Sequence, residues 1–130
     1  MSLLYIIDGC NVVYNPAFKK NFLKRNSDSR VLLIEAIKSE RLCGSENNRV
    51  FVVFDGYPDA SLQSMSGGNL NIIFSFEGSA DDKINGIIEL SANPREIAVV
   101  SDDKQIILCA RAFKAKPVSV EGFISRSVRR

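Results

Sequence analysis

The chain has 130 residues, of which 45% are hydrophobic and 25% are charged, a balance that is ordinary for a soluble globular protein with one core. We therefore expect a single domain over residues 1–130. The net charge of +2 permits a polyanionic partner but does not require one. The absence of histidine excludes Ser-His-Asp and Cys-His catalysis and most zinc enzymes, so any chemistry must rest on carboxylates, lysines, hydroxyls or thiols.

The cysteines indicate where the protein works. Cys10, Cys43 and Cys109 are odd in number and far apart, which argues against a zinc cluster or a disulfide framework and favours a reducing compartment. No basic region precedes the short apolar run near the N-terminus, and no stretch of about 18 apolar residues occurs. We therefore expect a cytoplasmic protein without a membrane segment.

The first third of the chain is expected to begin with a buried strand. Residues 3–7 are five apolar residues in a row, which is typical of a strand covered on both faces. Pro16 suits the first position of a helix that continues over 17–24. Apolar residues at helical spacing predict a second helix over 30–43, with Gly44 as its C-cap.

The middle of the chain predicts two further strands, at residues 50–54 and 70–76. Residues 57–69 between them are polar and rich in turn formers, which predicts a mobile loop above the sheet edge. A helix should follow from about residue 79, because Ser79 and an acid three residues later resemble a capping box. The inner face of this helix is expected to carry Ile84, Ile87, Ile88 and Leu90.

The last third repeats this alternation. A strand is expected over 97–101, a helix over about 104–113, a short strand over 117–120 and a last helix over 121–128. Buried strands that alternate with helices predict a mostly parallel five-stranded sheet between two helical layers. The fold class is therefore α/β, a three-layer α/β/α sandwich.

Acidic residues follow three of the predicted strands, and an acidic pair opens the helix that begins near residue 79. They are Asp8, Asp55, Asp81, Asp82, Asp102 and Asp103. Because the carboxyl ends of parallel strands meet at one sheet edge, these carboxylates should lie close together and repel one another unless a cation neutralises them. Oxygen ligands without histidine or cysteine point to Mg²⁺ or Mn²⁺ rather than zinc.

Each of these acids also has a purely structural explanation. Asp102 or Asp103 could be the N-cap of the following helix, where carboxylates accept backbone hydrogen bonds. Asp81 and Asp82 would lie in a first helical turn, which the helix dipole favours. The joint pattern favours a shared site, because three strands that end on aspartate exceed what capping requires.

Four motifs in the chain resemble the NYN/YacP-like branch of the PIN-domain ribonucleases. They are Asp8-Gly9-x-Asn11, Val53-Phe54-Asp55-Gly56, Ser79-Ala80-Asp81-Asp82-x-Ile84 and Val100-Ser101-Asp102-Asp103. The resemblance implies a PIN-like fold with strand order 3-2-1-4-5 and metal-dependent cleavage of RNA by an endoribonuclease. Cys10 departs from the family pattern, which often has an aromatic residue at this position.

The resemblance also implies roles for individual residues. Asp8, Asp81 and Asp102 correspond to the catalytic acids, and with Asp82 and Asp103 they would hold Mg²⁺ or Mn²⁺. Asn11, Asp55 and Ser101 would support them, and the basic residues that could hold substrate phosphates are Lys19, Lys20 and Lys104. The expected substrate is RNA, single-stranded or in a loop, with association with the ribosome as one means of delivery.

Three alternatives accompany this interpretation. A receiver-like phosphoacceptor domain fits the length and the acids, but it requires an acidic pair after the first strand, where this chain has Asp8-Gly9. A haloacid-dehalogenase-type phosphatase requires a second aspartate where Cys10 stands. A degenerate PIN-like RNA-binding module is the non-enzymatic alternative. Tyr14 and Tyr57 could stack on unpaired bases, although packing in the core or a loop explains them more simply.

Overall fold

A computed structural model describes residues 2–22 and 27–128, and its centre is one parallel sheet. The strands are β1 (Leu4–Asp8), β2 (Arg49–Phe54), β3 (Leu70–Phe74), β4 (Ile97–Val100) and β5 (Lys116–Val118). They lie in the order β3-β2-β1-β4-β5, and each neighbouring pair is parallel. The predicted strands and their 3-2-1-4-5 order are therefore confirmed.

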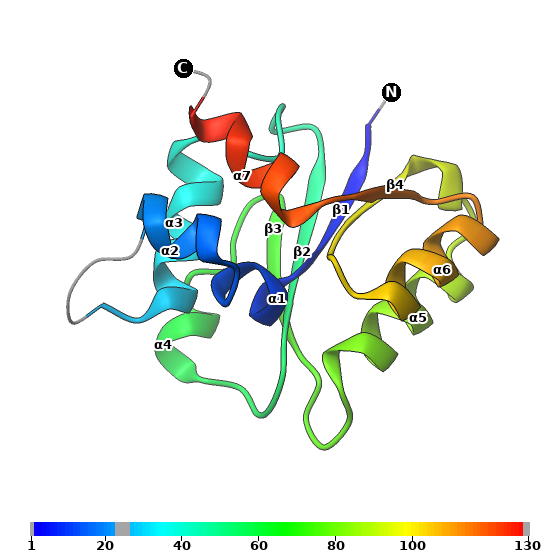
Figure 1. Cartoon of the computed structure of the whole chain (residues 1–130). Coiled ribbons are helices and arrows are strands. Elements are labelled where there is room, and N and C mark those ends of the chain that lie inside the picture. The colour runs from blue at the N-terminus through cyan, green and yellow to red at the C-terminus, as the bar shows by residue number, and fades with distance from the viewer. Residues whose placement is uncertain (1, 23–26, 129–130) are drawn as a thin grey trace.

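Helices cover both faces of this sheet (Figure 1). They are α1 (Gly9–Val13), α2 (Pro16–Phe22), α3 (Ser29–Ser39), α4 (Ala60–Gln63), α5 (Ala80–Leu90), α6 (Lys104–Ala112) and α7 (Val120–Val128), with a short 3-10 helix at Pro94–Glu96. Side chains of α1, α2, α3, α4 and α7 form one core with Ile7, Val52 and Phe54 of the sheet. Those of α5 and α6 form a second core with Ile6, Val53 and Val99. The three-layer α/β/α sandwich is thus confirmed.

The two cores explain why β1 is an unbroken apolar run. All five residues of β1 are buried, and successive side chains alternate between the two faces, so Ile7 enters one core and Ile6 the other. β1 also has neighbours on both edges, β2 and β4. A strand enclosed in this way has no solvent-facing position, and even its last residue, Asp8, is buried.

The second predicted helix ends earlier than its apolar pattern suggested. α3 stops at Ser39, and Arg41 adopts a positive φ of 50° in the turn that follows. Leu42 and Cys43 are nevertheless buried, which is why their spacing resembled a continued helix. The side chain of Asn48 donates a hydrogen bond to the carbonyl of Cys43 and holds this turn against the sheet. The helix predicted over 17–24 is seen to Phe22, and its last two residues lie outside the described ones.

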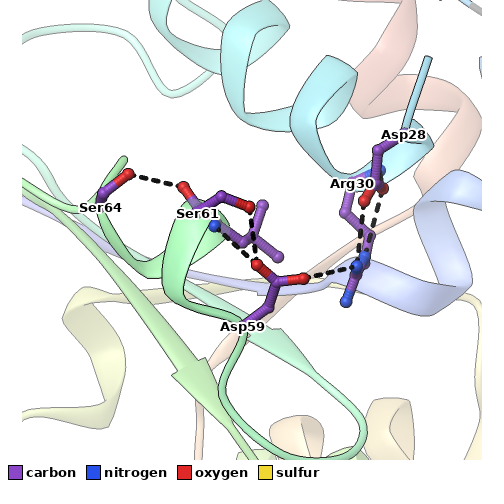
Figure 2. Close-up of polar contacts among 6 residues, drawn as sticks. Asp28, Arg30, Asp59, Ser61 and Ser64 are labelled. Atoms are coloured by element: carbon purple, nitrogen blue, oxygen red, sulfur yellow. Dashed lines mark hydrogen bonds and ion pairs between the residues drawn. The ribbon is translucent and has the colours of Figure 1, made fainter.

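The loop predicted over 57–69 contains a short helix that the sequence did not predict, α4, and this segment is anchored to α3. Asp59 is the N-cap of α4 and accepts a hydrogen bond from the backbone of Leu62, whose side chain is buried. Figure 2 shows Arg30 between Asp28 and Asp59, with nitrogen to oxygen distances of 3.0 Å and 3.4 Å. Capping and this ion pair therefore hold a segment whose composition is typical of a loop.

Leu90 does not join the inner face of α5, contrary to the prediction, and it is almost fully exposed. Ile84 and Ile88 are both buried and lie four residues apart on one face. Leu90 follows Ile88 by two residues, which rotates it about 200° around the helix. No helix in the described part of the chain is long and apolar enough to cross a membrane.

Candidate active site

A cleft of about 500 Å³ lies at the carboxyl edge of the sheet, where β1 and β4 are neighbours. Its lining residues are Asp8, Cys10, Asn11, Tyr14, Asn15, Asp55, Asp81, Asp102 and Asp103. The in-register pair Ile7 and Val100 brings the residues that follow them, Asp8 and Ser101, to the same place. The cleft thus collects acids from four separate segments of the chain.

Asp8 is the most buried residue of the cleft, with 4% of its surface exposed. Its Oδ2 accepts a hydrogen bond of 3.0 Å from the Oγ of Ser101. Burial raises the pKa of Asp8 from 3.8 to about 6, and the charges of Asp81 and Asp55 add to the rise. The hydrogen bonds from Ser101 and from the backbone of Asn11 oppose it. Asp8 is therefore a carboxylate held in an environment that disfavours its charge.

Asp81 enters the cleft from the first turn of α5. Burial raises the pKa of its carboxyl group, and the neighbouring charges of Asp103 and Asp55 raise it further. Asp81 and Asp103 are also close enough that a hydrogen bond between their side chains favours the protonated form of Asp81. The cleft therefore concentrates negative charge, as the sequence predicted.

Asp102 and Asp103 are neighbours with different structural tasks. Asp103 is the N-cap of α6, and its Oδ1 accepts hydrogen bonds from the backbone of Gln105 and Ile106. Asp102 does not cap α6; its Oδ1 accepts a hydrogen bond of 3.0 Å from the backbone of Val120, the first residue of α7. The capping explanation therefore applies to both acids, but on two different helices.

Three polar side chains fix the turn between β4 and α6. Asn11 Oδ1 accepts a hydrogen bond of 2.9 Å from the backbone of Asp102, and Asn15 Nδ2 lies 3.5 Å from Asp102 Oδ2. Ser101 Oγ accepts a hydrogen bond of 3.0 Å from the backbone of Asp103 while it donates to Asp8. Asn11 and Ser101 thus couple the acids that follow β1 and β4 through hydrogen bonds.

Asp55 supports the cleft from the end of β2. Its Oδ1 accepts a hydrogen bond of 2.7 Å from the backbone of Ala80, the first residue of α5. This bond fixes the start of the helix that carries Asp81. Ser79 is the N-cap of α5, since its Oγ accepts a hydrogen bond from the backbone of Asp82, which is one half of the predicted capping box.

Cys10 lines the cleft without being a reactive thiolate. Burial raises the pKa of its thiol above the ordinary value of 9.0, and the charge of Asp55 contributes to the rise. The thiol is therefore neutral near pH 7, which makes it a poor nucleophile and a poor metal ligand.

Five of the predicted site residues lie outside the cleft lining, and one of them, Ser101, is buried and donates its hydrogen bond to Asp8. Asp82 is exposed in the first turn of α5 and does not line the cleft with Asp81. Lys19, Lys20 and Lys104 are also exposed and do not line it. Lys19 is nevertheless connected to the cleft, because its Nζ lies 5.8 Å from the centre of the Tyr14 ring.

The sequence analysis missed Asn15 as a site residue. Its Oδ1 accepts a hydrogen bond from the backbone of Ala17 at the start of α2, while its Nδ2 reaches Asp102. The signal that could have identified it is the Asn15-Pro16 pair, because asparagine before proline favours a helix start close to the carboxyl end of β1.

Comparison with known families decides what kind of domain this is. Residues 5–129 match the family model described as the YacP-like NYN domain. The chain belongs to the YacP-like NYN domain family. This family is one of PIN-like nucleases, and membership makes RNA the expected class of substrate.

Solved structures support the same fold for this NYN domain. The crystal structure of Rae1 (YacP) from Bacillus subtilis matches with a TM-score of 0.72 and 24% sequence identity, over 99% of this chain and 75% of that one. A mutant of the same protein matches with a TM-score of 0.71 and 24% identity, over 99% of this chain and 76% of that one. A search of the curated proteins finds no match.

Nucleases of the NYN and PIN kind generally use divalent metals, and the donors of the cleft suit such an ion. Its acids supply oxygen ligands, which Mg²⁺ and Mn²⁺ prefer. The raised pKa values of Asp8 and Asp81 reflect burial and mutual repulsion, both of which a bound cation would offset. Among the described residues no three His, Cys, Asp or Glu side chains converge into a preformed metal site. The chemistry of the donors is therefore what supports a metal here.

Proposed function

We propose that this NYN domain is a metal-dependent endoribonuclease whose active site is the acidic cleft. The observation that carries the proposal is the burial of Asp8 beside the charges of Asp81 and Asp55. A buried carboxylate without a cationic partner costs stability, so its retention at the end of β1 argues for function. Family membership makes phosphodiester hydrolysis the reaction to test.

The residues would divide the work as follows. Asp8, Asp81, Asp102 and Asp103 would hold Mg²⁺ or Mn²⁺, and Asn11 and Ser101 would position them through the hydrogen bonds described above. When bound, such an ion lowers the pKa of a coordinated water and stabilises charge on phosphate oxygens. Asp55 would act indirectly, because it fixes the start of α5 and hence Asp81.

The substrate is proposed to be RNA with unpaired nucleotides. Lys19 and Lys104 are exposed on α2 and α6, where they could hold phosphates on either side of the reacting one. Lys20 is a neighbour of Lys19 on α2 and could do the same. A cytoplasmic location and delivery by the ribosome remain predictions from the sequence.

Two alternatives differ in what they require. A receiver-like domain has the strand order 2-1-3-4-5, whereas this sheet has β3-β2-β1-β4-β5, so the fold speaks against it. A degenerate RNA-binding module would keep the fold and the affinity for RNA but would not cleave.

Cleavage of a labelled single-stranded RNA tests the proposal. The purified protein should cut it with Mg²⁺ or Mn²⁺ and should stop in EDTA. Hydrolysis of this kind would leave a 5′-phosphate and a 3′-hydroxyl, so the products should accept a ligation that requires a 5′-phosphate. Cyclic 2′,3′-phosphate ends, or cleavage that persists in EDTA, would contradict this chemistry. Binding without cleavage under all metal conditions would favour the degenerate module.

A further inference from the structure

Two exposed aromatic rings lie immediately beyond the ends of β2 and β3. Tyr57 follows Asp55 by two residues after β2, and Phe76 follows β3 by two residues. Their ring centres are 5.8 Å apart at an interplanar angle of 89°, an edge-to-face contact. Tyr57 is 60% and Phe76 is 53% exposed, so neither ring belongs to a core. Tyr57 is therefore not packed in the core, which was one of the two simpler explanations for it.

The backbone beneath this pair is shaped to present it. Phe76 has a positive φ of 62°, a conformation that is rare for a bulky residue. Its backbone N–H donates a hydrogen bond of 2.7 Å to the carbonyl of Gly56, which itself has a φ of 94°. Ser75 Oγ accepts a hydrogen bond from the backbone of Gly56 and closes the contact. A phenylalanine that is both strained and exposed gains little from folding, so stability does not explain it.

The pair is joined to the cleft through Asp55. Asp55 lines the cleft and is separated from Tyr57 by Gly56 alone. A third aromatic ring, Tyr14, lines the cleft itself, is 71% exposed and lies 5.8 Å from Lys19 Nζ. A strand of RNA that occupies the cleft can therefore meet aromatic surface both inside it and beside it.

We propose that Tyr57 and Phe76 form a stacking site for an unpaired nucleobase of an RNA bound in the acidic cleft; this rests on the proposed function. The cleft lining contains acids but neither lysine nor arginine, so it repels phosphates and cannot supply affinity through ion pairs. Base stacking on aromatic rings is the common alternative source of affinity for single strands. A base-paired nucleotide keeps its faces within the helix, so this site would select unpaired RNA.

Binding of a fluorescent single-stranded oligoribonucleotide in EDTA tests the site without cleavage. The variants are Tyr57→Leu, Phe76→Leu and the double substitution, and Phe113→Leu is the matched control. Phe113 is an exposed ring at the C-cap of α6, at the opposite end of that helix from its N-cap, Asp103. Loss of one stacked base should weaken binding of the double variant about 5- to 150-fold. The control should bind like the parent.

A series of oligonucleotides with one abasic position each identifies the base. At one position, removal of the base should weaken binding to the parent but not to the double variant. The double variant has already lost the stacking interaction that this base makes, so removing the base costs it nothing more. Phe76→Gly removes the ring and the strained φ together, so it should lose affinity while melting at the same or a higher temperature.

Variants that bind as tightly as the parent, or that show no such position in the series, would overturn the stacking site. If the parent cleaves RNA with Mn²⁺ in that case, the proposed function stands without it. A parent that neither binds nor cleaves RNA would overturn both.

Discussion

Ser101 donates a hydrogen bond of 3.0 Å to Asp8 from the neighbouring end of β4, and both side chains are almost completely buried. They are the two buried polar side chains among residues 2–22 and 27–128. The single hydroxyl group also accepts a hydrogen bond from the backbone of Asp103. One serine thus joins Asp8 to the backbone of Asp103, and its hydrogen bond lowers the pKa of Asp8.

Asp8→Asn should stabilise the metal-free protein at neutral pH. The pKa of Asp8 is about 6 in the folded protein against an ordinary 3.8, so folding favours the protonated form. The free energy of unfolding should therefore fall as the pH rises from about 4 to about 6 and then stay level, with a total loss of about 3 kcal/mol. Denaturant unfolding in EDTA should show the variant more stable than the parent at pH 7.5. The difference between their free energies of unfolding should shrink toward pH 4. A variant that is less stable than the parent at every pH would contradict the claim that burial disfavours the charge of Asp8.

Ser101→Ala should extend to higher pH the range over which the protein loses stability. The hydrogen bond from Ser101 lowers the pKa of Asp8, so its loss leaves burial and the neighbouring acids less opposed. Unfolding measured over pH 4–8 in EDTA should place the loss of stability at higher pH than in the parent. Ser64→Ala is the matched control, because its hydroxyl donates to the carbonyl of Ser61, away from the cleft. A pH profile identical to that of the control would mean that Ser101 does not tune Asp8.

Gly9→Ala should destabilise the protein directly beside Asp8. A Cβ at Gly9 would collide with the ring of Phe54, which lies in the core. Overpacking of this kind costs about 1–3 kcal/mol, so the variant should unfold at lower denaturant concentration. Gly86→Ala is the contrast, because its Cβ would meet nothing within 4 Å and alanine favours a helix by about 1 kcal/mol. Equal effects of the two substitutions would contradict the close contact at Gly9.

Lys19→Ala and Lys104→Ala should each weaken RNA binding in a salt-dependent manner. For single strands, the slope of log affinity against log salt is about −0.7 per phosphate contact, so each variant should lose about 0.7 from the slope. Titrations of a non-cleavable RNA in EDTA at several salt concentrations measure this. Lys38→Ala is a control on α3, where Lys38 Nζ donates to the carbonyl of Met65. If neither variant changes the slope, the protein contacts phosphates through other residues.

The sequence predicted the strands and their order because buried parallel strands are unbroken apolar runs, as β1 shows. It also predicted that acids would gather at one sheet edge, since topology alone places Asp8 beside Ser101 and Asp102. It could not predict which acids would enter the cleft. Asp81 and Asp82 are adjacent in the chain and equally acidic, but helix geometry turns them in different directions and the cleft receives Asp81.

Local composition was misleading where long-range contacts decide the structure. Residues 57–69 have the composition of a loop, yet Arg30 pairs with Asp59 and Leu62 is buried, so a helix forms. The capping role of Asp102 was equally hidden, because its partner Val120 lies 18 residues away. Such contacts depend on the packing of α7 and α4 against the sheet, which no local pattern records.

The rate of Mn²⁺-dependent cleavage in Asp8→Asn, Asp81→Asn and Asp82→Asn tests the central claim most directly. All three substitutions remove one carboxylate charge with little change of shape, but Asp82 lies outside the cleft lining. Single-turnover cleavage of one labelled RNA should fall at least about 100-fold for the first two variants and stay within about threefold of the parent for the third. Equal loss in all three, or full activity of Asp8→Asn, would contradict a metal site built around Asp8.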